Sequence, residues 1–374
     1  MLRRLYIYQQ PDWPTLTWRA EDLADLLADV RHRQGRLLGK MSDLGFMPRQ
    51  EAMLATLTEE VVKTNEIEGE TLDANLVRSS VARRLGLDAG GLEHVDRNVE
   101  GAVEMMLDAT QRYDEPLTQD RLFDWQAALF PTGRSGMRRI IIGGWREDET
   151  GPMQVVSGPV GRERVHFEAP AAARIDAEMA AFLSWFNSPA ANDPVIKAGL
   201  AHLWFVTIHP FEDGNGRIAR AIAEMLLARA DGGNQRFYSV SAQIRRRRAD
   251  YYHTLERTQK ASTDITLWLT WFLDCLGMAV NASEATLAAV TAKERLWRNL
   301  SEVTVNDRQR RMINRLLDGF EGKLTAAKWA QITKCSHDTA LRDINDLISN
   351  GVLLRSQAGG RSTSYDLVAP SSSS

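Results

Sequence analysis

A stretch of twelve residues, from His209 to Arg220, holds most of the candidate chemistry of this chain. It reads His-Pro-Phe-Glu-Asp-Gly-Asn-Gly-Arg-Ile-Ala-Arg. An apolar segment of helical periodicity ends near Ile208, Pro210 breaks it, and a new helix must begin near Gly216. The glycines in between let backbone N–H groups turn toward one point at the N-terminus of that helix. Such an arrangement binds phosphate.

The polar side chains of this stretch suit the transfer of a phosphorus group. Asp213 is a hard oxygen ligand beside the anion site, as an Mg²⁺ ion that bridges phosphates requires. Arg217 and Arg220 are three residues apart, so they lie near one face and can bind further phosphate oxygens. His209 can take a proton from an attacking hydroxyl at neutral pH. The alternative is a helix connection with an incidental histidine, but the usable order of these groups favours an active site.

The stretch resembles the signature of the Fic family, His-Pro-Phe-x-Asp/Glu-Gly-Asn-Gly-Arg-x-x-Arg, with every specified position present. The resemblance implies a mainly α fold and transfer of AMP from ATP to a Ser, Thr or Tyr hydroxyl of a target protein, with pyrophosphate leaving. It implies that His209 is the general base and that Asp213 holds Mg²⁺. The other groups that it assigns to the phosphates are Gly214, Asn215, Gly216, Arg217 and Arg220.

A second stretch, Thr64 to Gly69, resembles the inhibitory motif Ser/Thr-x-x-x-Glu-Gly/Asn of the same family. In that family the glutamate, here Glu68, pairs with the second motif arginine, here Arg220, and occupies the γ-phosphate position. A solvated acidic helix end is the alternative. Because the motif precedes the catalytic segment, the resemblance places the chain in the group with an N-terminal inhibitory helix, the class II type.

Residues 137–170 interrupt the helical periodicity. Three apolar runs separated by glycines, Ile140–Ile142, Met153–Val156 and Arg164–Phe167, predict short strands and a hairpin. The resemblance implies that this insert is the family's flap, on which a target protein docks at about 153–168 by adding a β-strand. The flap residues expected nearest the nucleotide are Val165, His166 and Phe167.

Further along the chain, about thirty to forty residues beyond the motif, Tyr251, Tyr252 and Gln259 resemble family positions that bind the nucleotide base and sugar. Aromatic faces suit an adenine ring, but packing in the core is an equal alternative. For His166 a surface position is favoured over a catalytic role, because no nearby residue in the sequence gives it one. The basic run Arg245–Arg248 is interpreted as a solvated face.

The remaining periodicity predicts a mainly helical chain. The predicted helices before the last segment are Ala20–Leu38, Glu51–Asn65, Val95–Gln111, Leu117–Leu129, Ile175–Phe186, Val195–Ile208, Gly216–Arg229 and Thr266–Val280. The start of the chain, Tyr6 to Pro14, resembles a small helical module found ahead of Fic domains. The predicted domains are a module with the inhibitory motif at 1–90, a catalytic domain at 91–298 and a winged helix-turn-helix at 299–374.

The last domain is predicted from three helices and a two-stranded wing. These elements are Asp307–Phe320, Ala326–Thr333, Ser336–Asn350, Val352–Leu354 and Ser364–Leu367. Residues 301–374 contain ten Lys and Arg against eight Asp and Glu, a balance of +2. The expected recognition helix carries Asp338, Asp343 and Asp346, which DNA phosphates would repel. DNA binding and protein interaction or dimer packing are therefore equal alternatives.

Composition sets further bounds. The formal net charge is −3, which excludes a polycation built for nucleic acid, and two cysteines exclude a disulfide framework or a cysteine zinc cluster. We expect a cytoplasmic protein with no secretory signal and no membrane partner. Alternative functions are another Fic-type transfer (UMP, phosphate or phosphocholine), de-AMPylation, or an ATP-sensing transcriptional regulator. Self-modification, a homodimer, the target, the base preference and the release of inhibition are not encoded in any pattern.

Overall fold

The computed structural model describes residues 6–87, 96–148, 151–158, 162, 164–189, 192–300, 303–317, 320, 322–356 and 363–368. The chain forms two compact units. One comprises Met1–Gly45 and Arg49–Glu284, and the other comprises Phe46–Pro48 and Ala285–Ser374. Most of the predicted module at 1–90 and most of the predicted catalytic domain therefore share one unit.

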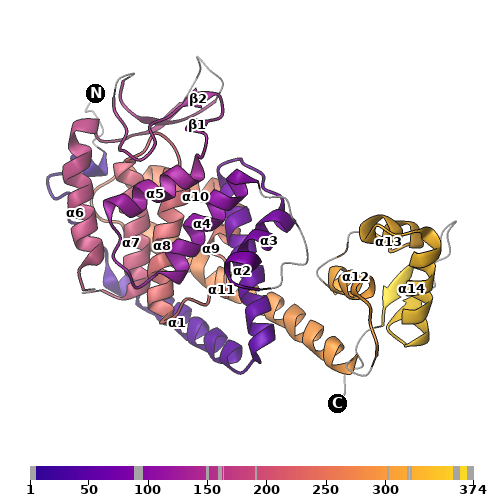
Figure 1. Cartoon of the computed structure of the whole chain (residues 1–374). Helices are drawn as coiled ribbons and strands as arrows, with labels where there is room; N and C mark the ends of the chain where they lie inside the picture. The colour runs from indigo at the N-terminus through magenta and orange to yellow at the C-terminus, as the bar shows by residue number, and fades with distance from the viewer. Residues whose placement is uncertain are drawn as a thin grey trace. The chain divides into compact units, whose positions relative to one another are not determined.

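The first unit is a bundle of helices, as the sequence predicts (Figure 1). Its helices are α1 (Ala20–Ser42), α3 (Ala74–Arg84), α4 (Arg97–Gln111), α5 (Gln119–Leu129), α6 (Ile175–Asn187), α7 (Pro194–Ile208), α8 (Asn215–Asp231), α9 (Val240–Arg246) and α10 (Arg248–Gln259). It also holds most of α2 (Phe46–Ile67) and the part of α11 (Thr266–Asn299) up to Glu284. Three helices, α3, α9 and α10, were not among those predicted. For α3 and α9 the sequence holds a start signal, because Asp73 and Ser239 cap their first turns.

Helix α7 lies in the middle of this bundle, and every residue from Val195 to Ile208 is buried. A helix that is apolar on all sides must be surrounded by other elements. It packs along α8, and Gly199 lets α11 approach so closely that Trp268 Nε1 donates to the Gly199 carbonyl at 2.7 Å. The connection from α7 to α8 is the predicted active-site stretch, so the core of the bundle positions it.

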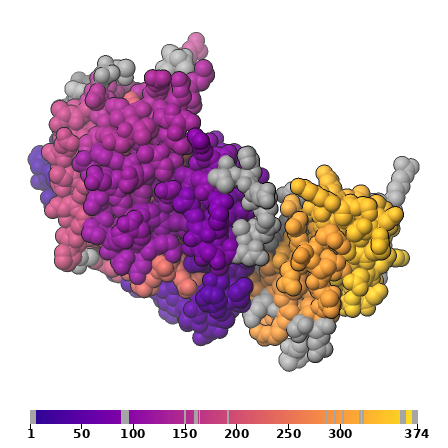
Figure 2. All heavy atoms as spheres, in the orientation of Figure 1, coloured from indigo at the N-terminus to yellow at the C-terminus, as the bar shows by residue number. Residues whose placement is uncertain are grey.

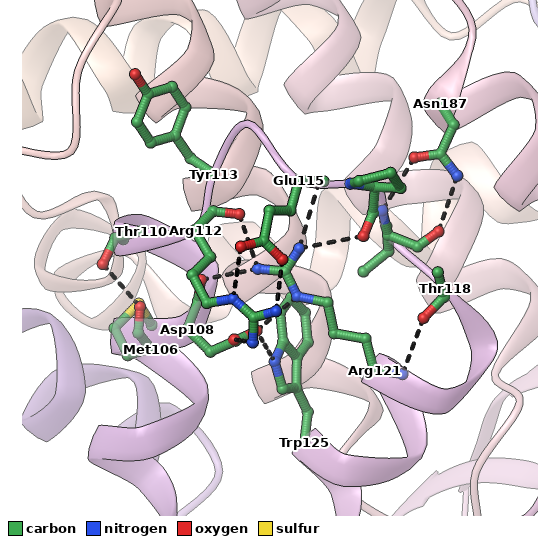
Figure 3. A network of polar contacts seen from close by, with 12 residues as sticks. Met106, Asp108, Thr110, Arg112, Tyr113, Glu115, Thr118, Arg121, Trp125 and Asn187 are labelled. Carbon is green, nitrogen blue, oxygen red and sulfur yellow. Dashed lines mark hydrogen bonds and ion pairs between the residues drawn. The ribbon is translucent and has the colours of Figure 1, made fainter.

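The network in Figure 3 fixes the connection between α4 and α5. The buried Arg121 guanidinium donates through Nε to Asp108 Oδ2 at 2.6 Å and through Nη2 to the Asp108 carbonyl at 2.8 Å. Trp125 Nε1 donates to the same carboxylate at 2.7 Å. Asn187, at the end of α6, exchanges two hydrogen bonds with the backbone of Leu117. These bonds hold α5 and α6 in a defined relation to α4.

The insert between α5 and α6 contains two hairpins: β1 (Arg134–Ser135) with β2 (Arg138–Arg139), and β3 (Gln154–Ser157) with β4 (Arg164–Glu168). The strand predicted at Ile140–Ile142 is wrong. The backbone groups of Ile141 bond to side chains instead, since its N–H donates to Glu212 and its carbonyl accepts from Gln126. The other two predicted strands are confirmed. In Figure 1 the insert lies at the upper end of the bundle, and Figure 2 shows its magenta atoms on the surface there.

The second unit contains the predicted elements in the predicted order. They are α12 (Asp307–Leu317), α13 (Ala326–Thr333), α14 (His337–Ser349), β5 (Leu353–Arg355) and β6 (Tyr365–Leu367). Buried residues such as Met312, Trp329 and Ile344 form its core. Two of the three aspartates expected to repel DNA are bonded to the segment that begins α12: Asp343 accepts from Arg308 at 2.8 Å, and Asp346 accepts from Gln309 at 2.7 Å.

Asp343 is therefore paired with a cation, whereas Asp338 and Asp346 are exposed and would still repel DNA phosphates. None of the helices in the described part of the chain is both long enough and apolar enough to cross a membrane.

Candidate active site

His209 ends α7 in a left-handed backbone conformation, with φ of 53°. A non-glycine residue adopts this conformation only when its surroundings hold it there. Its N–H donates to the Phe205 carbonyl at 3.0 Å, and its Nδ1 lies 3.3 Å from the Val206 carbonyl oxygen. A carbonyl oxygen only accepts, so Nδ1 carries the hydrogen in this contact and Nε2 is left unprotonated. The predicted general base is thus oriented to take a proton at Nε2.

Burial lowers the pKa of His209 to about 4, and the nearby charge of Arg146 acts in the same direction. We therefore expect His209 to stay neutral between pH 8 and pH 5, whereas an ordinary histidine is half protonated near pH 6.5. The ¹⁵N shifts of histidine-labelled protein measure this, with the His209→Ala variant assigning the signal. A midpoint near pH 6.5 for that signal would contradict the structure.

Arg146 is a site residue that the sequence did not single out. The residue is 2 % exposed, and its Nε donates to the His209 carbonyl at 2.7 Å. Its backbone N–H donates to the Pro210 carbonyl at 2.9 Å, and Nη1 pairs with Asp148 at 2.8 Å. One buried arginine thus fixes the backbone of His209 and Pro210. No sequence signal marks it, because its burial and its partner 63 residues away follow only from the fold.

The loop between α7 and α8 is closed by its own side chains. Asn215 Nδ2 donates to the Phe211 carbonyl at 2.8 Å, and Asn215 Oδ1 accepts from Phe211 N–H at 3.0 Å. Phe211 is buried against Trp145 and neighbouring rings, as predicted for a residue that anchors the loop. Both functional atoms of the Asn215 amide are therefore engaged in holding the loop. The expected phosphate contacts are left to backbone N–H groups of the first turn of α8.

Asp213 lies at this helix N-terminus and is partly exposed. Its Oδ1 accepts from Gly214 N–H at 2.6 Å, and its Oδ2 accepts from the hydroxyl of Ser135 on β1. Mg²⁺ in nucleotide sites takes one or two carboxylates together with phosphate oxygens and water. A single oriented carboxylate beside an anion site fits that ligand set. Ser135 is a second neighbour of the site that the sequence did not indicate.

The pair predicted from the inhibitory motif is present. Arg220 is 2 % exposed, and its Nη2 donates to Glu68 Oε1 at 2.7 Å. Thr64 holds the same guanidinium, since its hydroxyl accepts from Nε at 2.6 Å and its carbonyl accepts from Nη2 at 2.9 Å. A methyl group at Gly216 would lie 2.2 Å from Glu68 Oε1, so the missing side chain makes room for the carboxylate. Glu68 therefore rests on the first turn of α8, where an anion would bind.

Glu68 carries its charge in this position. Burial alone would raise its pKa, but the charges of Arg220 and Arg217 and the hydrogen bonds from Arg220 and Tyr252 outweigh burial and hold the pKa below its ordinary value. The Tyr252 hydroxyl lies 3.3 Å from Glu68 Oε2. The carboxylate is thus charged where it rests beside the first turn of α8.

Residues 116–227, which include this loop and α8, match the Fic/DOC family. The chain carries a Fic/DOC domain. The resemblance stated from the signature is confirmed. Residues 6–87, which precede the Fic domain, match a domain of unknown function termed DUF4172.

Relatives of the Fic domain are named protein adenylyltransferases. The protein of that name from Nematostella vectensis is 25% identical over 242 residues, which cover 64% of this chain and 51% of the relative. The one from Drosophila mojavensis is 37% identical over 99 residues, which cover 26% of this chain and 18% of the relative. The chain thus spans about half or less of the length of these relatives.

Two solved structures share the fold. A Fic family protein from Desulfovibrio desulfuricans has 22% identity and a TM-score of 0.55, covering 97% of this chain and 100% of its own. A Fic domain containing signaling protein from Bacteroides thetaiotaomicron has 19% identity and a TM-score of 0.50, covering 71% and 97%. At these identities the likeness concerns the fold alone.

Two of the predicted nucleotide residues are core residues of the first unit. Tyr251 is buried, and its hydroxyl lies 2.8 Å from His202 Nε2. Gln259 is buried as well, with its Nε2 3.3 Å from Thr207 Oγ1. The core alternative therefore describes both residues in this structure, while Tyr252 contacts Glu68.

The three predicted flap residues differ from one another in burial and in contacts. Phe167 is buried against Tyr8, while Val165 is 39 % exposed. His166 does have partners: its Nδ1 lies 2.7 Å from Glu256 on α10, and its Nε2 lies 2.6 Å from Ser157. His166 is thus a partly exposed strand residue, as favoured, and it also ties β4 to α10 through a contact across 90 residues that the sequence does not reveal.

The basic run Arg245–Arg248 lies at the junction of α9 and α10, and three of its four arginines are exposed, as the interpretation of a solvated face requires. Arg248 Nε also donates to the Ile67 carbonyl at 2.6 Å, and Arg245 pairs with Glu66 at 3.3 Å. These two arginines therefore hold the end of α2, which Glu68 follows, against α9 and α10.

Proposed function

We propose that this chain is a protein adenylyltransferase that Glu68 holds inactive. It would transfer AMP from ATP to a Ser, Thr or Tyr hydroxyl of a target protein. The observation that carries the proposal is the arrangement of one loop: a neutral histidine, a carboxylate suited to Mg²⁺, a helix N-terminus and two arginines, with a glutamate resting on the anion position. The names of the relatives support the same activity.

In the proposed reaction, His209 Nε2 takes the proton of the target hydroxyl while its oxygen attacks the α-phosphorus. The bond between the α-phosphorus and the bridging oxygen breaks, and pyrophosphate leaves with that electron pair. Arg217, Arg220 and the first-turn N–H groups of α8 bind the charged oxygens and orient the chain of phosphates. Mg²⁺, held by Asp213, would neutralise phosphate charge.

Glu68 would oppose this reaction because its carboxylate competes for the same donors. A phosphate oxygen that approaches Arg220 must displace Glu68 Oε1, which already lies 2.7 Å from Nη2. The resting state of the proposed enzyme is therefore off.

The flap is the proposed docking site of the target. Val156 and Val165 are cross-strand partners on β3 and β4, and they are 47 % and 39 % exposed. In the described part of the insert these strands pair only with each other, so an added strand is feasible. We also propose a cytoplasmic location, supported by two cysteines that are both free.

The test is transfer of label from ATP by the Glu68→Gly protein, alone and with a cell extract as a source of targets. We expect protein to be labelled from α-³²P-ATP and not from γ-³²P-ATP, because AMP keeps only the α-phosphorus. His209→Ala in the same background should lower the rate by about 10²–10⁴-fold, as loss of a general base does.

Other outcomes favour the alternatives. Label from the γ-phosphate would indicate phosphate transfer, and label from UTP but not ATP would indicate UMP transfer. Release of AMP from modified protein would indicate de-AMPylation. Tight ATP binding with no transfer in any variant would favour an ATP-sensing regulator and overturn the proposal.

A further inference from the structure

The two motif arginines both face the end of α2, but they meet different carboxylates. Arg220 meets Glu68, as described above. Arg217 Nη1 donates to Glu70 Oε2 at 2.6 Å and to Asn65 Oδ1 at 3.2 Å. Its guanidinium also lies over the Phe130 ring, 4.9 Å from the centroid. Each arginine expected to bind phosphate is thus already paired with a carboxylate.

The turn after α2 explains how two residues so close in sequence reach two arginines. Gly69 has a φ of 88°, which a residue with a side chain rarely adopts. The turn is closed by Glu70 N–H, which donates to the Asn65 carbonyl at 3.1 Å. The chain therefore reverses at Gly69, and the carboxylates on both sides of it are directed at α8.

Each guanidinium also keeps one buried donor for which the described residues supply no acceptor: Arg217 Nε and Arg220 Nη1. Buried donors without an acceptor are rare in proteins. A triphosphate offers oxygens to both at once, whereas each carboxylate satisfies only part of its arginine. The pair of carboxylates is therefore an incomplete substitute for the phosphates.

We propose that Glu70 is a second competitor of the nucleotide, which blocks Arg217 as Glu68 blocks Arg220. This inference rests on the proposed function. It assigns each phosphate-binding arginine its own carboxylate, and it means that removal of Glu68 alone leaves the site partly blocked. The Glu70 side chain is 48 % exposed and that of Glu68 is 29 % exposed, while both arginines are buried. The effect of Glu70 is therefore smaller and more sensitive to salt.

A structural role is the competing explanation. Glu70 could only anchor the end of α2, so that its loss would act by loosening Glu68. The two explanations differ once Glu68 is gone. An anchor then has nothing left to hold, whereas a competitor still opposes the phosphates at Arg217.

The experiment measures the equilibrium affinity for Mg²⁺-ATP of the full chain carrying His209→Ala, which prevents turnover. Glu70→Gln is compared in two backgrounds, with Glu68 intact and with Glu68→Gly. We expect Glu70→Gln to tighten ATP binding by about threefold to tenfold in the Glu68→Gly background, and the gain to shrink at high salt. Binding of AMP, which lacks the β- and γ-phosphates, should change by less than twofold.

Glu66→Gln is the matched control, since Glu66 lies in the same segment but pairs with Lys63 and Arg245. If Glu66→Gln tightens ATP binding as much as Glu70→Gln does, general charge and not competition at Arg217 is the cause. If Glu70→Gln leaves ATP affinity unchanged in the Glu68→Gly background, the inference is overturned while the proposed function stands. Failure of AMP transfer by the Glu68→Gly chain is a separate result, and it overturns the proposed function.

Discussion

Replacing Glu68 with glycine should raise the affinity of the chain for ATP by about 10–100-fold and turn on AMP transfer. The estimate follows from the bond that the nucleotide must replace. A hydrogen bond between charged groups contributes about 1.5–3 kcal/mol, and here Glu68 occupies the Arg220 Nη2 that a phosphate oxygen would take. With Glu68 gone, the buried guanidinium has lost its carboxylate, and the phosphates become its best partner.

Isothermal titration with ATP in the His209→Ala background measures the affinity. Incorporation of α-³²P into protein by the chain with His209 intact measures the release of inhibition. Glu66→Gly is the matched control, because it removes a carboxylate from the last turn of α2 without touching Arg220. If Glu66→Gly relieves inhibition as much as Glu68→Gly does, fraying of α2 and not the Glu68 carboxylate is responsible, and the proposed inhibition by Glu68 is wrong.

The parts of the site that the sequence predicts are those whose partners are close along the chain or fixed by a known motif. His209, Asp213 and the glycines lie within one short connection between two helices, so the proline and the following helix already determine their arrangement. The Glu68–Arg220 pair spans 152 residues, and the resemblance of both motifs to one family made it predictable.

What the sequence could not supply are contacts set by packing alone. Arg146 and Ser135 look like ordinary polar residues until the fold places them at the His209 carbonyl and at Asp213. Tyr251 shows the opposite difficulty: an aromatic residue suits adenine and core equally well in the sequence, and only the fold shows that its ring is buried. Glu70 resembles any solvated glutamate, since the turn at Gly69 directs it only in the folded chain.

The packing of α4 against α5 also affects the site, because it sets the position of Phe130. Phe130 follows α5, and its ring contacts both Arg217 and Gly214, where a methyl group would lie 3.0 Å from Phe130 Cε2. Helices α4 and α5 contact each other at Gly101 on α4, where a methyl group would lie 1.7 Å from the carbonyl oxygen of Ala128 on α5. Because the obstacle is backbone, no rotamer change relieves it. The position of Phe130 thus depends on the absence of a side chain at 101.

Gly101→Ala should therefore be the most destabilising small substitution in the first unit, with a loss of about 3 kcal/mol in its free energy of unfolding. The thermal transition of that unit should fall by about 6 °C or more. Gly35→Ala is the matched control: it lies in the exposed middle of α1 with nothing within 4 Å of a new methyl group. That change should stabilise the helix by about 0.5–1 kcal/mol. Calorimetry at a fixed scan rate compares both with the parent chain, and equal transitions for all three would show that α4 and α5 do not meet as closely as the structure has them.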